Sequence, residues 1–200
     1  MKVYTVMEEN NHFSYTWHLI KTDLQRFGHH ANAVGILRIF SPYCFSFKTT
    51  FWYRIGHYLL QCNHPLLRKA VLPFVRLIHQ YNSYRTGIQM PFNVTAGEGL
   101  LFGHYSCIVI NGHTILGNHV TISHGVTLGN NLTKGSGAPV IGDNCVLGPG
   151  CKALGPIELG HHCFVGANAV ITRSFPPGSV LGGVNQRIGK NGVELVPLYS

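Results

Sequence analysis

The sequence predicts a mainly β protein, in which a parallel β-helix of hexapeptide repeats follows an α-helical N-terminal region. Between Leu116 and Phe175, aliphatic or small residues recur every six positions with one interruption, and glycine often follows them. A second apolar series stands four positions after members of the first. Such a period indicates a solenoid whose coils must stack to bury their apolar faces. The first series is Leu116, Ile122, Leu128, Ile141, Leu147, Ala153, Leu159, Val165 and Ile171, and the second is Val120, Val126, Cys145, Cys151, Ile157, Cys163 and Ala169.

The N-terminal region has helical spacing instead. Apolar residues predict a first helix that begins near Trp17 and ends at Gly28. A second helix is expected at about 47–62, and a third at about 65–84, kinked or broken near Pro73. We expect these helices to cap the N-terminal end of the coil.

A change of composition near Thr86 divides the chain. Glycine, asparagine and aliphatic residues replace the helical pattern there. We therefore expect a helical region at 1–86, a β-helix at 87–182 and a C-terminal tail at 183–200.

Two irregularities interrupt the hexapeptide period. Phe102 and Ile108 keep the six-residue step, and two extra residues are expected to shift the phase before Leu116. The polar, glycine-rich segment 129–139 then adds residues that the coil does not need. A loop that breaks a regular scaffold is more often functional than structural, so we expect this segment to leave the coil and to serve the site.

Composition narrows the class of protein. Only 11% of residues are charged, against about 25% in an average soluble domain, so we expect the chain to bury surface against its own copies. The net charge of +8 suggests an anionic partner, but the basic residues follow no nucleic-acid-binding motif. The sequence has no long apolar run, signal-peptide pattern or CxxC pair, so a reducing cytoplasm is the expected location.

Two histidines are candidate catalytic residues. His104 stands two residues after Phe102, and His124 stands two residues after Ile122. Their separation equals one eighteen-residue coil plus the two-residue shift, so both side chains should project from the same side of successive coils. Histidine is the usual general base at neutral pH. Solvated corner positions are expected for the other coil histidines, His113, His119, His161 and His162, and no metal-ligand spacing is present.

The chain resembles the serine acetyltransferase group of hexapeptide acyltransferases, in particular the short members associated with bacterial surface-polysaccharide synthesis. The most specific block is Gly-Leu-Leu-Phe-Gly-His at 99–104, followed by Ile-Val-Ile-Asn at 108–111. Further similar segments lie at 19–26, 51–59, 122–129, 141–150 and 165–170.

This resemblance implies a left-handed β-helix, a homotrimer or a dimer of trimers, active sites shared between subunits, acetyl-CoA as donor and no metal. His104 matches the catalytic histidine of the family, and 129–139 matches its donor-binding loop. The implied acetyl-CoA contacts are Gly129, Lys134 and Ala138 in the loop, Gly148, Gly150, Gly166 and Ala167 beside the pantetheine arm, and Arg187 and Lys190 near the phosphates.

Departures from the family pattern bear on the acceptor. Serine-specific members carry aspartates at the positions of Gln89 and Gly103, and a histidine at the position of Ala138. The ammonium group of free serine needs a carboxylate partner, and leaving it unpaired in a desolvated site costs about 2–5 kcal/mol. We therefore expect a neutral sugar hydroxyl as acceptor, with Gln89 and Asn111 in the acceptor site.

Several alternatives stay open from the sequence. The main prediction is a sugar or polysaccharide O-acetyltransferase; the alternatives are a serine O-acetyltransferase of cysteine synthesis and a non-catalytic interaction module. His124 is a second proton-handling group, an acceptor contact or a surface histidine. The basic, apolar segment 64–80 either lies on a membrane surface or packs against the coil cap or a second trimer.

Overall fold

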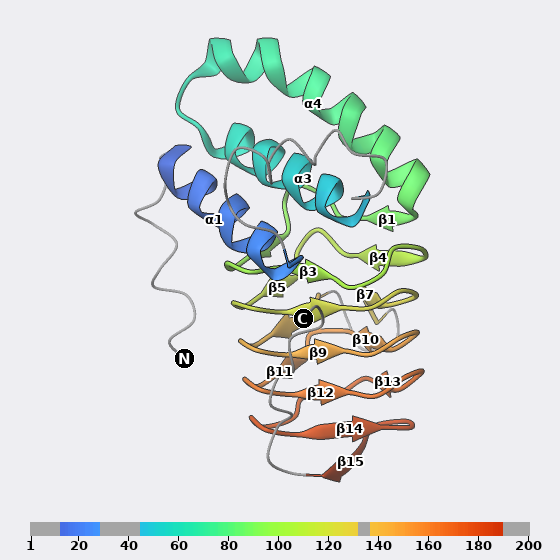
Figure 1. Cartoon of the computed structure of the whole chain (residues 1–200). Helices are drawn as coiled ribbons and strands as arrows, with labels where there is room; N and C mark the ends of the chain where they lie inside the picture. The colour runs from blue at the N-terminus through green and yellow to red at the C-terminus, as the bar shows by residue number, and fades with distance from the viewer. Residues whose placement is uncertain (1–12, 29–44, 132–136, 190–200) are drawn as a thin grey trace.

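A three-sided column of short strands, capped at one end by helices, makes up the molecule in the computed structural model (Figure 1). The structure describes residues 13–28, 45–131 and 137–189. The helices are α1 (Phe13–Arg26), α3 (Phe45–Gln61) and α4 (Pro65–Thr86). They lie at the N-terminal end of the column, with α4 outermost, as predicted for a cap.

Each turn of the chain adds one strand to each of three sheets, which form the three faces of the column. Sheet A contains β1 (Ile88–Gln89), β4 (Ile108–Ile110), β7 (Thr127–Gly129), β10 (Lys152–Leu154) and β13 (Val170–Ile171). Sheet B contains β2 (Thr95–Ala96), β5 (Ile115–Leu116), β8 (Val140–Ile141) and β11 (Glu158–Leu159). Sheet C contains β3 (Leu101–Phe102), β6 (Thr121–Ile122), β9 (Val146–Leu147), β12 (Phe164–Val165), β14 (Val180–Gly182) and β15 (Gln186–Gly189).

The strands pair in parallel from coil to coil, except that β15 returns antiparallel to β14. This topology confirms the parallel β-helix. Both repeat series point inward: the residues of each are buried, and most have no exposed surface. The cysteines of the second series are therefore small buried core residues, as predicted.

Corners connect the sheets and stack into three edges. The CA edge joins sheet C to sheet A and contains residues 103–107, 123–126, 148–151 and 166–169. The AB edge contains 111–114, 130–131, 137–139 and 155–157, and the BC edge contains 97–100, 117–120, 142–145 and 160–163. The separation of these edges decides which predicted site residues meet.

The register corrects one prediction. Phe102 pairs with Ile122, and Val109 pairs with Thr127, so the corner between β3 and β4 is two residues longer than the corner below it. The extra residues therefore lie between Phe102 and Ile108, and the predicted six-residue step between those two was wrong. Ile108 remains buried because it belongs to the second inward series, above Val126.

The helices are close to prediction, with one difference. α1 and α3 begin and end near the expected residues, and Gly28 follows α1 with a positive φ of 72°. α4 runs without a break through Pro73, so a break there was wrong, and the alternative of a kink stays a prediction. Pro73 is exposed, and the helix retains its buried stripe on both sides of it, including Leu72 and Val75. Tertiary packing thus offsets the one backbone hydrogen bond that proline removes.

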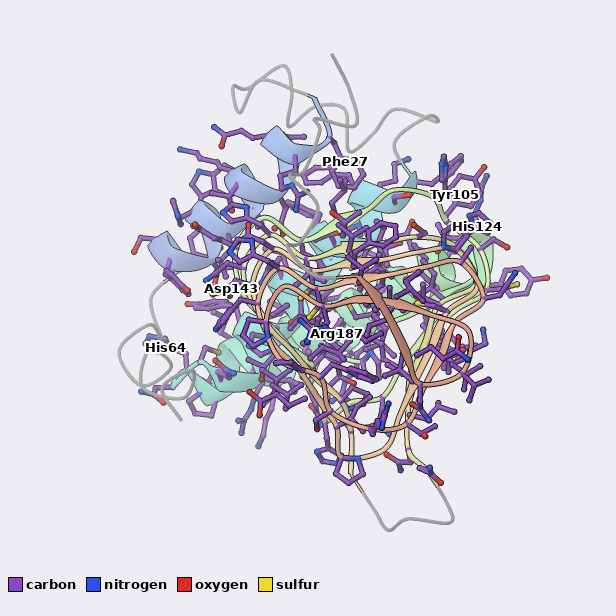
Figure 2. All side chains as sticks on the ribbon, turned by 90° about the horizontal axis from the view of Figure 1, so that it is seen from below. Phe27, His64, Tyr105, His124, Asp143 and Arg187 are labelled. Atoms are coloured by element: carbon purple, nitrogen blue, oxygen red, sulfur yellow. The ribbon has the colours of Figure 1, made fainter. Side chains whose placement is uncertain are left out.

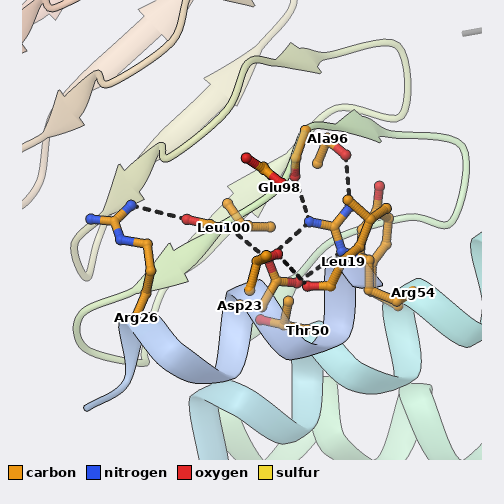
Figure 3. A network of polar contacts seen from close by, with 12 residues as sticks. Leu19, Asp23, Arg26, Thr50, Arg54, Ala96, Glu98 and Leu100 are labelled. Atoms are coloured by element: carbon orange, nitrogen blue, oxygen red, sulfur yellow. Dashed lines mark hydrogen bonds and ion pairs between the residues drawn. The ribbon is translucent and has the colours of Figure 1, made fainter. Parts of the chain in front are cut away.

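The helical cap is attached to the first coil through a buried ion pair. Asp23 of α1 accepts hydrogen bonds from Arg54 Nε of α3 at 2.8 Å and from the Leu100 amide of the coil at 2.7 Å. Arg54 also donates to the carbonyl oxygens of Ala96 and Gly97, both at 2.6 Å. Figure 3 shows the two charged groups facing each other where α1, α3 and the coil meet. Burial raises the pKa of the Asp23 carboxyl, and the Arg54 guanidinium opposes that shift.

One continuous group of buried residues extends from α3 and α4 into the coil, so the helices share the core of the column. No helix among the described residues is long and apolar enough to cross a membrane. The division of the chain at 86 and 182 into separate regions stays a prediction.

Candidate active site

His104 and His124 lie together on the CA edge, in the first and second coils. Their ring centroids are 5.9 Å apart and the rings are at 66° to each other. Both side chains are exposed. The prediction that they project from the same side of successive coils is therefore confirmed.

The lengthened corner between β3 and β4 is what carries His104. Its backbone turns through two non-glycine residues with positive φ, Ser106 at 105° and Cys107 at 52°. The Ser106 carbonyl accepts a hydrogen bond from the Gly125 amide of the corner below, at 2.9 Å. This bond keeps the longer corner stacked on the corner of the next coil. The two inserted residues are therefore accommodated at the edge, where His104 is exposed, and the coil continues without a break.

Tyr105 is a residue at this edge that the sequence reasoning missed. Its side chain is exposed and contacts the Phe45 ring of α3 edge-on, with centroids 5.9 Å apart. Figure 2 places Tyr105 and His124 on the same edge of the column. The two-residue lengthening after Phe102, once placed in the correct corner, is the sequence signal that would have identified Tyr105.

A ladder of backbone hydrogen bonds continues down the CA edge below the histidines. The Gly150 amide donates to the His124 carbonyl at 2.9 Å, and the Asn168 amide donates to the Pro149 carbonyl at 2.8 Å. Four of the predicted acetyl-CoA contacts lie in these two corners: Gly148, Gly150, Gly166 and Ala167. The structure thus puts the predicted catalytic pair and these predicted donor contacts in one line.

Two of these glycines are also required by the coil itself. A Cβ at Gly148 would lie 2.5 Å from the Val165 carbonyl oxygen, and a Cβ at Gly150 would lie 2.1 Å from Asn168 Oδ1. Gly150 also has a φ of 71°. Their occurrence is explained by coil stacking, so glycine at these positions does not by itself indicate a ligand.

Other predicted residues lie on the AB edge, away from the histidines. Gly129 ends β7, and Ala138 precedes β8. Asn111 donates to Asn130 Oδ1 at 3.0 Å and accepts from the His113 amide at 2.9 Å, so its amide group is engaged within its own corner. Within one chain, these residues do not meet the CA edge.

The remaining predicted residues are scattered. Gln89 is exposed on sheet A, paired in register with Val109. Arg187 is exposed on β15, and Figure 2 shows it near the middle of the lower end of the column. Lys134 and Lys190 lie outside the described residues, so their predicted contacts stay predictions.

The described carboxylates lie away from the histidine pair in the fold. Asp23 is buried against Arg54, and Glu98 on the BC edge accepts from His18 at 2.9 Å and lies 3.5 Å from His119. Asp143 on the same edge lies 3.1 Å from His161 Nδ1. His119 and His161 were expected to be solvated corner residues, but each has an acidic neighbour.

Glu158, the fourth described carboxylate, begins β11 on sheet B. Among residues 13–28, 45–131 and 137–189, no group of three or more His, Cys, Asp or Glu is arranged to hold a metal ion. The CA edge brings the two imidazoles together beside a ladder of backbone amides.

Comparison with known proteins agrees with this fold. The family model "Bacterial transferase hexapeptide (six repeats)" matches residues 138–173. The serine acetyltransferase of Mycobacterium tuberculosis is 34% identical over 152 residues, which cover 74% of this chain and 63% of that protein. The serine acetyltransferase of Helicobacter pylori strain J99 is 35% identical over 125 residues, which cover 62% of this chain and 73% of that protein. The crystal structure of the Neisseria gonorrhoeae serine acetyltransferase superposes with a TM-score of 0.73 at 24% identity, covering 88% of this chain and 66% of that one.

The hexapeptide column defines the class of left-handed β-helix proteins with hexapeptide repeats. The chain belongs to the serine acetyltransferase family of hexapeptide-repeat acyltransferases. It spans about three fifths of the length of the M. tuberculosis relative, so the relative's activity does not transfer directly.

Proposed function

We propose that the protein is an O-acetyltransferase that takes the acetyl group of acetyl-CoA and passes it to a hydroxyl. The observation that carries this proposal is the exposed His104–His124 pair at the head of the CA edge. Relatives named serine acetyltransferase support the reaction class.

His104 acts as the general base. Its imidazole takes the proton of the acceptor hydroxyl while the hydroxyl oxygen attacks the thioester carbonyl carbon, a form of help worth about 10²–10⁴-fold in rate. The tetrahedral oxyanion needs a hydrogen-bond donor, which a backbone amide or the His124 imidazole provides. Collapse of the intermediate breaks the C–S bond, and the imidazolium returns its proton to the departing thiolate. No covalent enzyme intermediate is needed.

The site is completed by a neighbouring copy of the chain. The histidines lie on the CA edge, whereas Gly129 ends β7 next to the AB edge and Ala138 lies on the AB edge, on the other side of sheet A. A donor-binding segment on the AB edge serves the histidines of another subunit when three columns pack side by side. We therefore propose a homotrimer with shared active sites, and a dimer of trimers as a further assembly.

The acceptor is the finer part of the proposal. The relatives favour serine, and we propose serine O-acetylation first, ahead of the sugar acceptor that the sequence suggested. One observation still favours a neutral sugar hydroxyl. The four described carboxylates all lie away from the CA edge, which leaves the ammonium group of serine without an evident counter-charge.

Thiol release from acetyl-CoA tests the reaction and the acceptor together. Wild type and His104→Ala are compared with serine and with a panel of sugars, and His162→Ala, at an exposed histidine on the BC edge, serves as a control. Turnover that disappears in His104→Ala and persists in His162→Ala is expected. Turnover with a sugar but not with serine would make the sugar the favoured acceptor. Binding of acetyl-CoA without turnover of any acceptor would contradict the proposed enzymatic activity.

A cytoplasmic location is part of the same proposal. Four cysteines are buried and unpaired, Cys62, Cys145, Cys151 and Cys163, and this arrangement fits a reducing compartment.

A further inference from the structure

α4 has two apolar faces. Within the described part of the chain, one face packs against the rest of the molecule and the other is exposed. Its buried stripe is Leu72, Val75, His79, Asn82 and Thr86, which pack onto α3 and the first coil. A second stripe follows the same helical period on the opposite side and is exposed to solvent. Its large members are Leu66, Phe74, Leu77, Tyr81 and Tyr84.

The second stripe lies at the end of the molecule. α4 is the outermost element in Figure 1, at the opposite end of the column from β15. With 22 residues, it is about 33 Å long. Five large apolar side chains on one exposed helix face form a patch of the kind that marks an interaction surface.

The charges around this stripe are all positive. Lys69 and Arg76 are exposed on the flank of the helix, and Arg85 lies near the C-terminal end of the stripe. Neither α3 nor α4 contains an aspartate or a glutamate.

We propose that the outer face of α4 docks on an anionic lipid surface. A helix with an apolar stripe and flanking Lys and Arg residues lies in the plane of a membrane interface, with the apolar side chains among the lipids and the cations at the headgroups. The two tyrosines suit that depth, since one end of each ring is apolar and the other polar. α4 does not meet the requirements for a spanning helix, so it lies on the membrane.

Charge distinguishes this occupant from a second copy of the chain. Two copies joined through this face would bring one basic helix against another, with no carboxylate on α3 or α4 to neutralise them. An anionic membrane supplies the missing negative charge.

The test is co-sedimentation of the intact protein with vesicles. Binding is expected to vesicles of phosphatidylcholine and phosphatidylglycerol at low salt, to weaken at high salt, and to be much weaker with phosphatidylcholine alone. Arg76→Gln should lower the affinity about fivefold, and Arg173→Gln on the coil should leave it unchanged. Leu77→Ser should lower it about tenfold.

Ile188→Ser is the matched control for Leu77→Ser, because Leu77 is 68% exposed and Ile188 on β15 is 66% exposed. Molecular mass is measured for the same variants without vesicles, and the circular dichroism spectrum checks that each is folded. The proposal is overturned if vesicles are not bound, if both lipid compositions bind equally, or if Leu77→Ser lowers the molecular mass, which would mean that a second copy covers the face.

Discussion

Removing the charge of Asp23 should lower the free energy of unfolding, because it weakens the attachment of the helical cap to the coil. Asp23→Asn preserves the size of the side chain but leaves Arg54, which is 2% exposed, without its counter-charge. The carboxylate accepts from Arg54 Nε at 2.8 Å, from Arg54 Nη2 at 3.1 Å and from the Leu100 amide at 2.7 Å. Breaking a buried pair by removing one partner costs about 3–5 kcal/mol.

That cost converts into a measurable melting shift. For a domain of this size, 1 kcal/mol moves the melting temperature by about 2–4 °C, so a decrease of about 6–20 °C is expected. Thermal unfolding followed by circular dichroism measures it, at one fixed protein concentration because the melting temperature of an oligomer depends on concentration.

Glu98→Gln is the control for this experiment. Glu98 pairs with His18 at 2.9 Å, but both side chains are partly exposed, so its loss should cost about 1 kcal/mol or less. In addition, the double variant Asp23→Leu with Arg54→Leu should be less destabilised than the sum of the two single variants, because no unpaired charge remains. Equal shifts for Asp23→Asn and Glu98→Gln, or strict additivity of the leucine variants, would refute the reasoning.

Three further outcomes are expected. Gly103→Asp should raise kcat/KM for serine about tenfold, because a Cβ there meets no atom within 4 Å and the carboxylate would lie next to His104. Gly103→Ala is the control. No gain for Gly103→Asp would mean that the missing carboxylate does not limit turnover of serine. Gly150→Ala should lower stability by about 1–3 kcal/mol in thermal unfolding, since φ is 71° and the new Cβ meets Asn168, and a cost equal to that of Gly103→Ala would contradict this. Burial raises the pKa of the Cys151 thiol to about 12, so at pH 8 a thiol reagent should label exposed Cys107 and spare Cys151 in peptide mapping, whereas equal labelling would show that the core opens.

The regular part of the coil could be predicted because its physics is periodic. A six-residue spacing of aliphatic residues has one efficient way to bury them, and each predicted inward residue from Leu116 to Ile171 is buried. The pairing of His104 with His124 followed from the same counting. The period could not locate the two inserted residues, which lie in the corner beside His104. A periodic pattern contains no information about which corner accepts an insertion.

Contacts between distant segments were also beyond sequence reasoning. Nothing near Asp23 in the sequence indicates that Arg54 and the Leu100 amide are its partners, because the three come together only when α1 and α3 dock on the first coil. The same holds for Glu98, which is six residues from His104 in the sequence but turns to His18 and His119 on the BC edge. Proximity along the chain therefore does not identify a carboxylate partner for His104.

The proposed lipid-binding face of α4 and the proposed catalytic pair lie at the same end of the column, and this arrangement allows an experiment that distinguishes the two candidate acceptors. His104 and His124 are in the two coils nearest the helices, and the corners predicted to bind acetyl-CoA follow farther from α4. Neighbouring coils are about 4.8 Å apart, so the histidines would work close to the membrane surface while acetyl-CoA enters from the aqueous side. If the acceptor is a lipid-linked sugar, anionic vesicles containing it should lower KM for wild type and not for Leu77→Ser. If the acceptor is free serine, vesicles should leave KM unchanged for both wild type and Leu77→Ser, because free serine does not accumulate at a membrane surface.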